Sequence, residues 1–141
     1  MHVYPVREQQ LDEQMSVLSN NGLKIEVDVT VRVNPKYNKS GDLHEKFGRD
    51  YINTLVRPEI RSAVRNIIGR FEPEELYSSK RDEVQQLIQE DLEKSLDANF
   101  LDLKATLIRD IELPDKVKNA IIKSVSIFFI LLYYIIRSIL V

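Results

Sequence analysis

Apolar and polar residues alternate strictly over residues 23–33, and this period of two predicts a β-strand with one buried face. The preceding Asn-Asn-Gly at 20–22 favours the left-handed backbone conformations of a tight hairpin turn. Residues 3–18 contain two short apolar clusters separated by polar residues, so strand structure is also expected before the turn. These segments together predict an antiparallel hairpin at the start of the fold.

A second alternating stretch covers residues 101–113, far along the chain from the first. Its phase slips near Ile108 and Arg109 and then resumes, which a β-bulge would explain. We therefore expect a long strand that returns to the sheet after the middle of the chain.

In the middle of the chain, apolar residues recur at intervals of three and four, as on the buried stripe of an amphipathic helix. The strongest early pattern covers residues 51–68, and Pro58 inside it predicts a kink or a helix restart. A shorter helix before it is expected to have Ser40 as its N-cap and Gly48 at its end.

Three further helices are indicated by their starting residues. Pro73 suits the first position of a short helical turn. Ser79 and Asp82, three residues apart, resemble a capping box for a helix that extends to about Asn99. From Pro114 onward no glycine or proline interrupts the chain, so a final helix is expected to run into the apolar tail.

Strands on both sides of the helical middle predict an α+β fold, with the helices packed on one face of a small, mostly antiparallel sheet. A chain of 141 residues can bury one sizeable core and is too short for two. We expect one domain in residues 1–123, followed by an apolar C-terminal helix in residues 124–141.

Composition removes several classes of function. The formal net charge is −2 and argues against a nucleic-acid partner, which needs a clustered positive surface. The absence of cysteine excludes disulfides, thiolate metal sites and thiol nucleophiles. The four glycines are widely spaced and form no phosphate-binding motif, so no nucleotide cofactor is expected.

The histidine, serine and lysine residues, which often act in catalysis, are not arranged in a recognisable catalytic motif. His2 and His44 are far apart in sequence, and neither belongs to a cluster of metal-ligand residues. Ser78, Ser79 and Lys80 are adjacent and could suggest a serine–lysine dyad, but helix capping is the simpler explanation. The sequence therefore predicts no enzyme activity, no catalytic or metal site and no cofactor.

Charged residues on two predicted helices suggest an electrostatic match, either within one subunit or between neighbours in an assembly. Four-residue spacing aligns three arginines along one ridge of the helix expected over residues 51–68. The helix expected to end at about Asn99 is rich in carboxylates, for which a solvated face is the default interpretation. Exposed pairs of this kind set register better than they hold subunits together. The residues of this expected oligomer or ion-pair surface are Arg57, Arg61, Arg65, Arg70, Asp82, Glu83, Glu90 and Asp91.

The last segment, residues 124–141, has the composition of a membrane-inserting helix. As a helix it would measure about 27 Å, close to the ~30 Å hydrocarbon core of a bilayer. Its aliphatic and Phe side chains would gain up to about 4 to 7 kcal/mol on insertion. Arg137 lies near the end, where its side chain can reach the interface. The side chains expected in lipid include Phe128, Phe129, Leu131, Leu132, Ile135 and Ile136.

Two other interpretations of residues 124–141 compete with insertion. The segment could pack on its own domain or on a partner, although it lacks a polar face for solvent. It could also be the remnant of a truncated or frame-shifted gene product, which is compatible with insertion.

Three strings in the chain resemble the prohibitin group of the stomatin/prohibitin/flotillin (SPFH) superfamily. They are NNGLKIEVDVTVRV at 20–33, VRPEIRSAVRNIIGRFEPEELYSSKRDEV at 56–84 and LIRDIELPDKVKNAI at 107–121. The resemblance covers roughly residues 3–123. Members of this group usually have a long charged coiled coil after the domain, where this sequence has its apolar tail.

The resemblance implies a non-enzymatic, membrane-attached scaffold that assembles laterally into homo-oligomeric rings or cages. Such proteins organise membrane microdomains and restrain or partner membrane-bound AAA proteases, at a bacterial plasma membrane or the mitochondrial inner membrane. No catalytic residues belong to the family pattern. The alternative is a soluble partner-binding regulatory module, and in that case the chain would be a truncated member that does not assemble.

Overall fold

The computed structural model describes residues 7–77 and 80–140, with the side chains of residues 115–122 and 124 excepted. Its sheet has three antiparallel strands in the order β1-β2-β3. They are β1 (Gln9–Leu18), β2 (Lys24–Pro35) and β3 (Leu101–Glu112). This confirms the small antiparallel sheet, while the apolar cluster expected within residues 3–6 lies outside the described residues.

The hairpin turn between β1 and β2 has the backbone that its sequence predicts. Gly22 has φ +81°, a left-handed conformation that glycine adopts without steric cost. The N–H of Ser19 donates to the carbonyl of Leu23 over 2.9 Å, and the Ser19 hydroxyl accepts from the Leu23 N–H. Backbone and side chain therefore close the turn together.

β3 contains two bulges where one was expected. Its register against β2 shifts first beside Val29, where Arg109 is the extra residue and the predicted phase slip is confirmed. A second shift beside Val33 leaves Lys104 as an extra residue, and it was not predicted. An extra residue bends a strand and increases its twist, so β3 curves over the helices beneath it.

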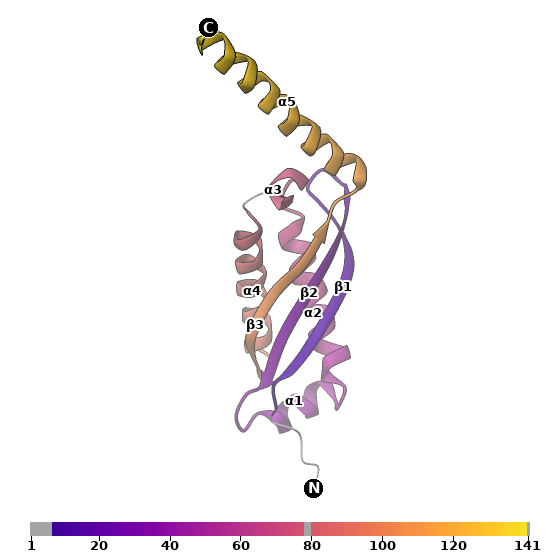
Figure 1. The fold of residues 1–141 in the computed structure, drawn as a ribbon. Helices are drawn as coiled ribbons and strands as arrows, with labels where there is room; N and C mark the ends of the chain where they lie inside the picture. The colour runs from indigo at the N-terminus through magenta and orange to yellow at the C-terminus, as the bar shows by residue number, and fades with distance from the viewer. Residues whose placement is uncertain (1–6, 78–79, 141) are drawn as a thin grey trace.

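The helices confirm the α+β class, because those between β2 and β3 lie on one face of the sheet, and a last helix follows β3 (Figure 1). Their bounds are α1 (Ser40–Phe47), the π-helix η1 (Ile52–Val56), α2 (Arg57–Ile68), α3 (Pro73–Tyr77), α4 (Arg81–Asp97) and α5 (Asp115–Leu140).

Where a kink or a helix restart was expected near Pro58, the helix changes type: the π-helix η1 continues directly into α2, with Val56 and Arg57 both in the right-handed helical region. In η1 the N–H of Arg57 donates to the carbonyl of Ile52, five residues earlier. The α-helix then begins at Arg57, which makes Pro58 its second residue. At this position the missing N–H of proline costs little.

Helix ends were predicted less well than helix bodies. Ser40 was expected to cap α1 but is its first helical residue, and Lys39 occupies the N-cap with no side-chain hydrogen bond. Gly48, with φ +81°, ends this helix as expected. Lys80 is the N-cap of α4, again without a side-chain capping hydrogen bond. The Ser79 of the expected capping box and the Ser78 beside it lie outside the described residues.

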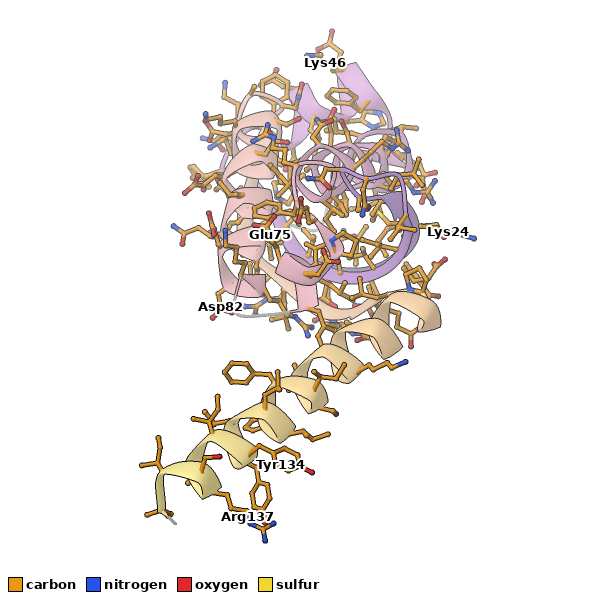
Figure 2. All side chains as sticks on the ribbon, turned by 90° about the horizontal axis from the view of Figure 1, so that it is seen from above. Lys24, Lys46, Glu75, Asp82, Tyr134 and Arg137 are labelled. Carbon is orange, nitrogen blue, oxygen red and sulfur yellow. The ribbon has the colours of Figure 1, made fainter. Side chains whose placement is uncertain are left out.

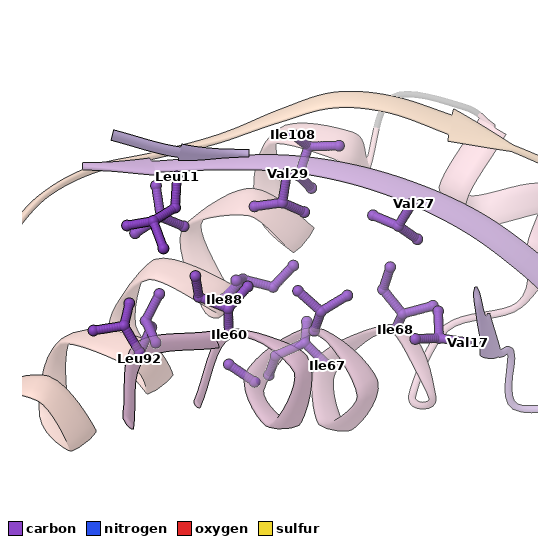
Figure 3. Close-up of a cluster of buried hydrophobic side chains, with 14 of the residues drawn as sticks. Leu11, Val17, Val27, Val29, Ile60, Ile67, Ile68, Ile88, Leu92 and Ile108 are labelled. Atoms are coloured by element: carbon purple, nitrogen blue, oxygen red, sulfur yellow. The ribbon is translucent and has the colours of Figure 1, made fainter. Parts of the chain in front are cut away.

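The core lies between the sheet and the helix pair α2 and α4, with α2 beneath β1 and α4 beneath β3. Figure 3 shows Val27 and Val29 of the sheet facing Ile60, Ile68 and Ile88 of the helices. Burial of large aliphatic side chains contributes most of the stability of such a layered domain. The largest fully buried side chains are Ile25, Leu43, Ile60, Ile68, Leu76, Ile88, Leu92, Leu96, Leu101, Val27, Val29 and Val31.

The final helix α5 leaves the end of β3 and points away from the sheet and its helices (Figure 1). Figure 2 shows Tyr134 and Arg137 on this helix, well outside the domain. All of its described side chains, at 123 and 125–140, are exposed, so the helix does not pack on its own domain in this structure. Within the described part of the chain, no helix has the length and apolar character needed to cross a membrane.

Candidate functional site: two charged helix faces and an apolar helix

The arginines of α2 are oriented towards β1 by a buried carboxylate. Glu13 of β1 is only 4% exposed, and each of its two carboxylate oxygens bonds a different arginine. Nε of Arg61 lies 2.7 Å from Oε1, and Nη1 of Arg57 bonds Oε2. A buried charge of this kind needs such partners, because burial removes its hydration.

Glu13 was missed as a partner, although the sequence contains a signal for it. Leu11 and Val17 are buried, Met15 is half-buried, and all three lie on the same face of β1 as Glu13. Successive side chains in a strand point to opposite faces, so the odd-numbered positions of β1 all face the helices. A carboxylate at an inward position of this pattern predicts a cationic partner beneath the sheet.

We call Arg57, Arg61 and Arg65 the arginine ridge of α2. Arg61 and Arg65 are exposed, whereas Arg57 is half-buried. Arg70, the fourth predicted residue, lies beyond the last residue of α2 and is outside the ridge. The ridge therefore combines two arginines that Glu13 orients with a third that extends the row along the helix.

We call Asp82, Glu83, Glu90 and Glu93 the acidic stripe of α4. All four are exposed, and three of them line one shallow hollow on the helix surface. The predicted residue Asp91 is also exposed, but it lies about 180° around the helix from Asp82 and is outside the stripe.

Asp97, near the end of the same helix, is bonded within the subunit. Its carboxylate lies 2.6 Å from Nζ of Lys36, which also lies 2.8 Å from the carboxylate of Asp102. The hydrogen bond with Asp102, followed by the one with Asp97, raises the pKa of Lys36 above its ordinary value. This pair of bonds ties the end of α4 to the sheet.

The expected match between the two helices within one subunit is not what the structure contains. Among the described residues, no ion pair joins the arginine ridge to the acidic stripe. The polar contact between α2 and α4 is instead a hydrogen bond from the Ser95 hydroxyl to Glu59. The ridge turns towards β1 and the stripe turns away from α2, because Ser95, Val84 and Ile88 face inward on α4.

The open face of the sheet, opposite the helices, is polar and joined across strands. The guanidinium of Arg109 on β3 lies 3.3 Å from carboxylates of both Asp12 and Asp28. The hydroxyl of Thr30 donates to Asp12 over 2.7 Å, and this bond, with the charge of Arg109, lowers the pKa of the Asp12 carboxyl. All three strands are therefore linked through their side chains.

The backbone of β3 is bonded to side chains of α4. The N–H of Ile108 donates to Oε1 of Gln85 over 2.9 Å. Its carbonyl accepts from Nη2 of Arg81 over 3.0 Å. Both polar backbone groups of Ile108, beside the first bulge, are thus satisfied by one helix.

The described residues contain no cluster suited to a metal ion. No group of three or more His, Asp or Glu side chains in this part of the chain could hold one. His44 lies on α1, and His2 lies outside the described residues.

The apolar residues that were expected in lipid all lie on α5 and are all exposed. Phe128 is 63% and Phe129 62% exposed, and their rings meet edge to face with centroids 6.2 Å apart. The others are Leu131, Leu132, Ile135 and Ile136. At about 100° per residue these six side chains cover about 160° of the helix circumference, and the exposed Ile127, Ile130, Tyr133 and Tyr134 lie on the remaining side.

A comparison of the chain with curated proteins found no match. A comparison with protein-family models found one that covers residues 1–127, described as SPFH domain / Band 7 family. Proteins with this domain are in general membrane-associated scaffolds without enzymatic activity. Since the match extends over most of the 141 residues and includes every strand and helix up to the start of α5, the chain belongs to the SPFH domain / Band 7 family.

Proposed function

We propose that this chain is a prohibitin-type scaffold domain, held at a membrane by α5, that self-assembles and organises membrane proteins without catalysing a reaction. The observation that carries the proposal is the surface of α5. Its described apolar side chains are exposed, and the helix itself points away from the domain (Figure 1). Exposed apolar surface of this extent marks a site of contact with lipid or protein.

Lipid is the favoured environment because of the helix composition. The aliphatic and Phe side chains of the tail gain free energy on transfer out of water. Arg137 lies in the last turn of α5, where its charged group can reach the polar interface while its stem stays in lipid. Contact of α5 with lipid is therefore favourable without an ion pair between Arg137 and the rest of the domain.

The finer assignment rests on the sequence. The segment 56–84, with the arginines of α2 and the start of α4, is the longest of the three strings that resemble prohibitins. That resemblance supports a role in restraining or partnering a membrane-bound AAA protease. It also supports a location at a bacterial plasma membrane or the mitochondrial inner membrane.

Vesicle flotation of the full chain tests the membrane contact. The chain should rise with phosphatidylcholine/phosphatidylglycerol vesicles in a density gradient. A variant with polar replacements on α5, F129S/L132S/I136S, should stay in the dense fraction. The matched control F129L/L132I/I136L keeps the apolar surface and should rise like the parent.

A full chain that remains in the dense fraction as a monomer would contradict the proposal. It would favour the alternative, a soluble module that binds and regulates a partner. Removal of residues 124–141 then distinguishes the two functions further, because partner binding should survive the deletion only if the domain itself makes the contact.

A further inference from the structure

The two helices that cover the sheet carry opposite charge at opposite edges of the helix layer. α2 lies beneath β1 and α4 beneath β3, and these strands are the two edges of the sheet. Glu13 on β1 draws the arginine ridge towards the first edge. The acidic stripe lies on the outer side of α4, away from the residues that face β3 and α2 (Figure 2, Asp82).

We infer that copies of this chain pack side by side, with the arginine ridge of one copy against the acidic stripe of the next. This inference rests on the proposed scaffold function and names the surfaces through which the scaffold would assemble. The contact joins two different faces, so it is heterologous, and repetition would produce a ring or an open filament.

A second copy is the occupant that the charges favour. Each copy carries both a positive and a negative surface, and neither is neutralised by the other within the subunit. The net charge of −2 is small, so copies do not repel one another strongly as whole molecules. Both surfaces run along a helix, and Arg57 and Arg65 are eight residues apart, as are Asp82 and Glu90, so the two pairs have the same axial spacing.

Glu13 has a positioning role in this contact. It bonds Arg57 and Arg61 from the core side and so fixes the direction of their side chains before a neighbour arrives. Arg61 remains 57% exposed, which leaves donors of its guanidinium available to a carboxylate outside the subunit. Less side-chain freedom is then lost when copies meet.

The contact should be weak in solution and stronger on a membrane. One helix face buries only a few hundred Å², roughly half of what one partner contributes to a stable interface. Exposed ion pairs are also screened by salt. Attachment of every copy to one membrane raises the local concentration, so assembly should depend on the membrane and fall as salt rises.

Disulfide cross-linking tests the inference directly, because the chain contains no cysteine. Ser62 on α2 and Gln86 on α4 are exposed and lie among the charged residues of their respective helices. Full-length S62C and Q86C chains are mixed on vesicles and oxidised. The mixture should give dimers that contain one chain of each kind, neither chain alone should cross-link, and the double variant S62C/Q86C should give a ladder of oligomers.

Charge reversal identifies the forces in the contact. R65E in the S62C chain should abolish cross-linking to Q86C. The reversed partner E90R in the Q86C chain should restore it. K24E makes the same change of charge on an exposed residue at the start of β2 and should leave cross-linking intact.

Three outcomes would overturn the side-by-side packing. They are dimers formed by each cysteine variant with itself, absence of cross-links in the mixture, and cross-links that persist unchanged with R65E. Flotation of the same samples distinguishes this failure from that of the proposed function. If the chain does not rise with vesicles, the proposed function fails, and the cross-links are then scored at equal protein concentration in mild detergent.

Discussion

Because the carboxylate of Glu13 is buried, removal of its arginine partners should destabilise the fold more than removal of the carboxylate itself. Its side chain is 4% exposed, whereas those of Arg57 and Arg61 are 36% and 57% exposed. Loss of both arginines, as in R57M/R61M, leaves the buried carboxylate of Glu13 with neither an ion-pair partner nor full hydration. Loss of the carboxylate, as in E13Q, leaves arginines whose charged groups already meet water.

The magnitudes follow from this difference in exposure. Removal of the partners of a buried charge costs about 3 to 5 kcal/mol, so R57M/R61M should lose about that much unfolding free energy. E13Q should lose only about 1 to 2 kcal/mol, because the amide oxygen still accepts one bond and the arginines can be hydrated. Replacement of all three side chains, E13L/R57M/R61M, should return stability to within about 1 kcal/mol of the parent.

Urea unfolding measures the difference. Circular dichroism at 222 nm follows the helices of the full chain in one mild detergent for all variants, and a common slope with urea indicates a common unfolded state. In a domain of this size, each kcal/mol corresponds to about 2 to 4 °C in Tm. R65M is the matched control, because Arg65 belongs to the same ridge and has no ion pair with Glu13.

The reasoning would be refuted if E13Q proved more destabilising than R57M/R61M. It would also be refuted if the triple variant were as unstable as the double variant. Either result would mean that the carboxylate is hydrated in the folded protein, or that packing of the arginine stems dominates the effect.

Three further predictions concern the core and two titrating groups. Leu92→Ala removes a fully buried side chain and should cost about 2 to 5 kcal/mol in urea unfolding, whereas Leu107→Ala, at a position 52% exposed, should change it by less than about 0.5 kcal/mol. Burial raises the pKa of the Tyr51 phenol. The stability that the neutral phenol contributes is therefore present below about pH 10 and is lost as pH rises through the raised pKa. The urea midpoint of the parent should therefore fall more between pH 9 and pH 11 than that of Tyr51→Phe, and equal falls would contradict the buried phenol. The Thr30 hydroxyl lowers the pKa of Asp12, so the stability that this carboxylate contributes is present above about pH 4 and is lost as pH falls through the lowered value. On acidification, the urea midpoint of Asp12→Asn should therefore fall less than that of the parent. Superimposable pH profiles would count against the hydrogen bond from Thr30 to Asp12.

The strands and the helix bodies could be predicted because each depends on a local period in the sequence. The alternation in residues 23–33 defines the buried face of β2, and the slip near Ile108 marks a real bulge. The change of helix type at Arg57 lies beside Pro58, where the sequence predicted an irregularity, although the sequence did not indicate a π-helix. These features require no knowledge of contacts between distant segments.

The ion pairs could not be predicted in the same way, because partners far apart in sequence depend on how the elements pack. The arginines of α2 were matched with an acidic helix, and two of them pair instead with Glu13, which lies 44 and 48 residues away from them. The second bulge, at Lys104, was missed because the alternation around it stays nearly regular. The N-cap expected at Ser40 was wrong, since Lys39 holds that position without a side-chain capping hydrogen bond.

The two edge strands of the sheet, β1 and β3, carry features that oppose pairing with the sheet of another molecule. An unprotected border strand can extend into the sheet of a neighbour and start aggregation. Here Glu13 holds the partly exposed Arg57 and Arg61 beside β1, where a foreign strand would bury their charges. At the other edge, α4 already bonds the backbone N–H and carbonyl of Ile108 on β3. Dense crowding on a surface should therefore leave each sheet separate from the next.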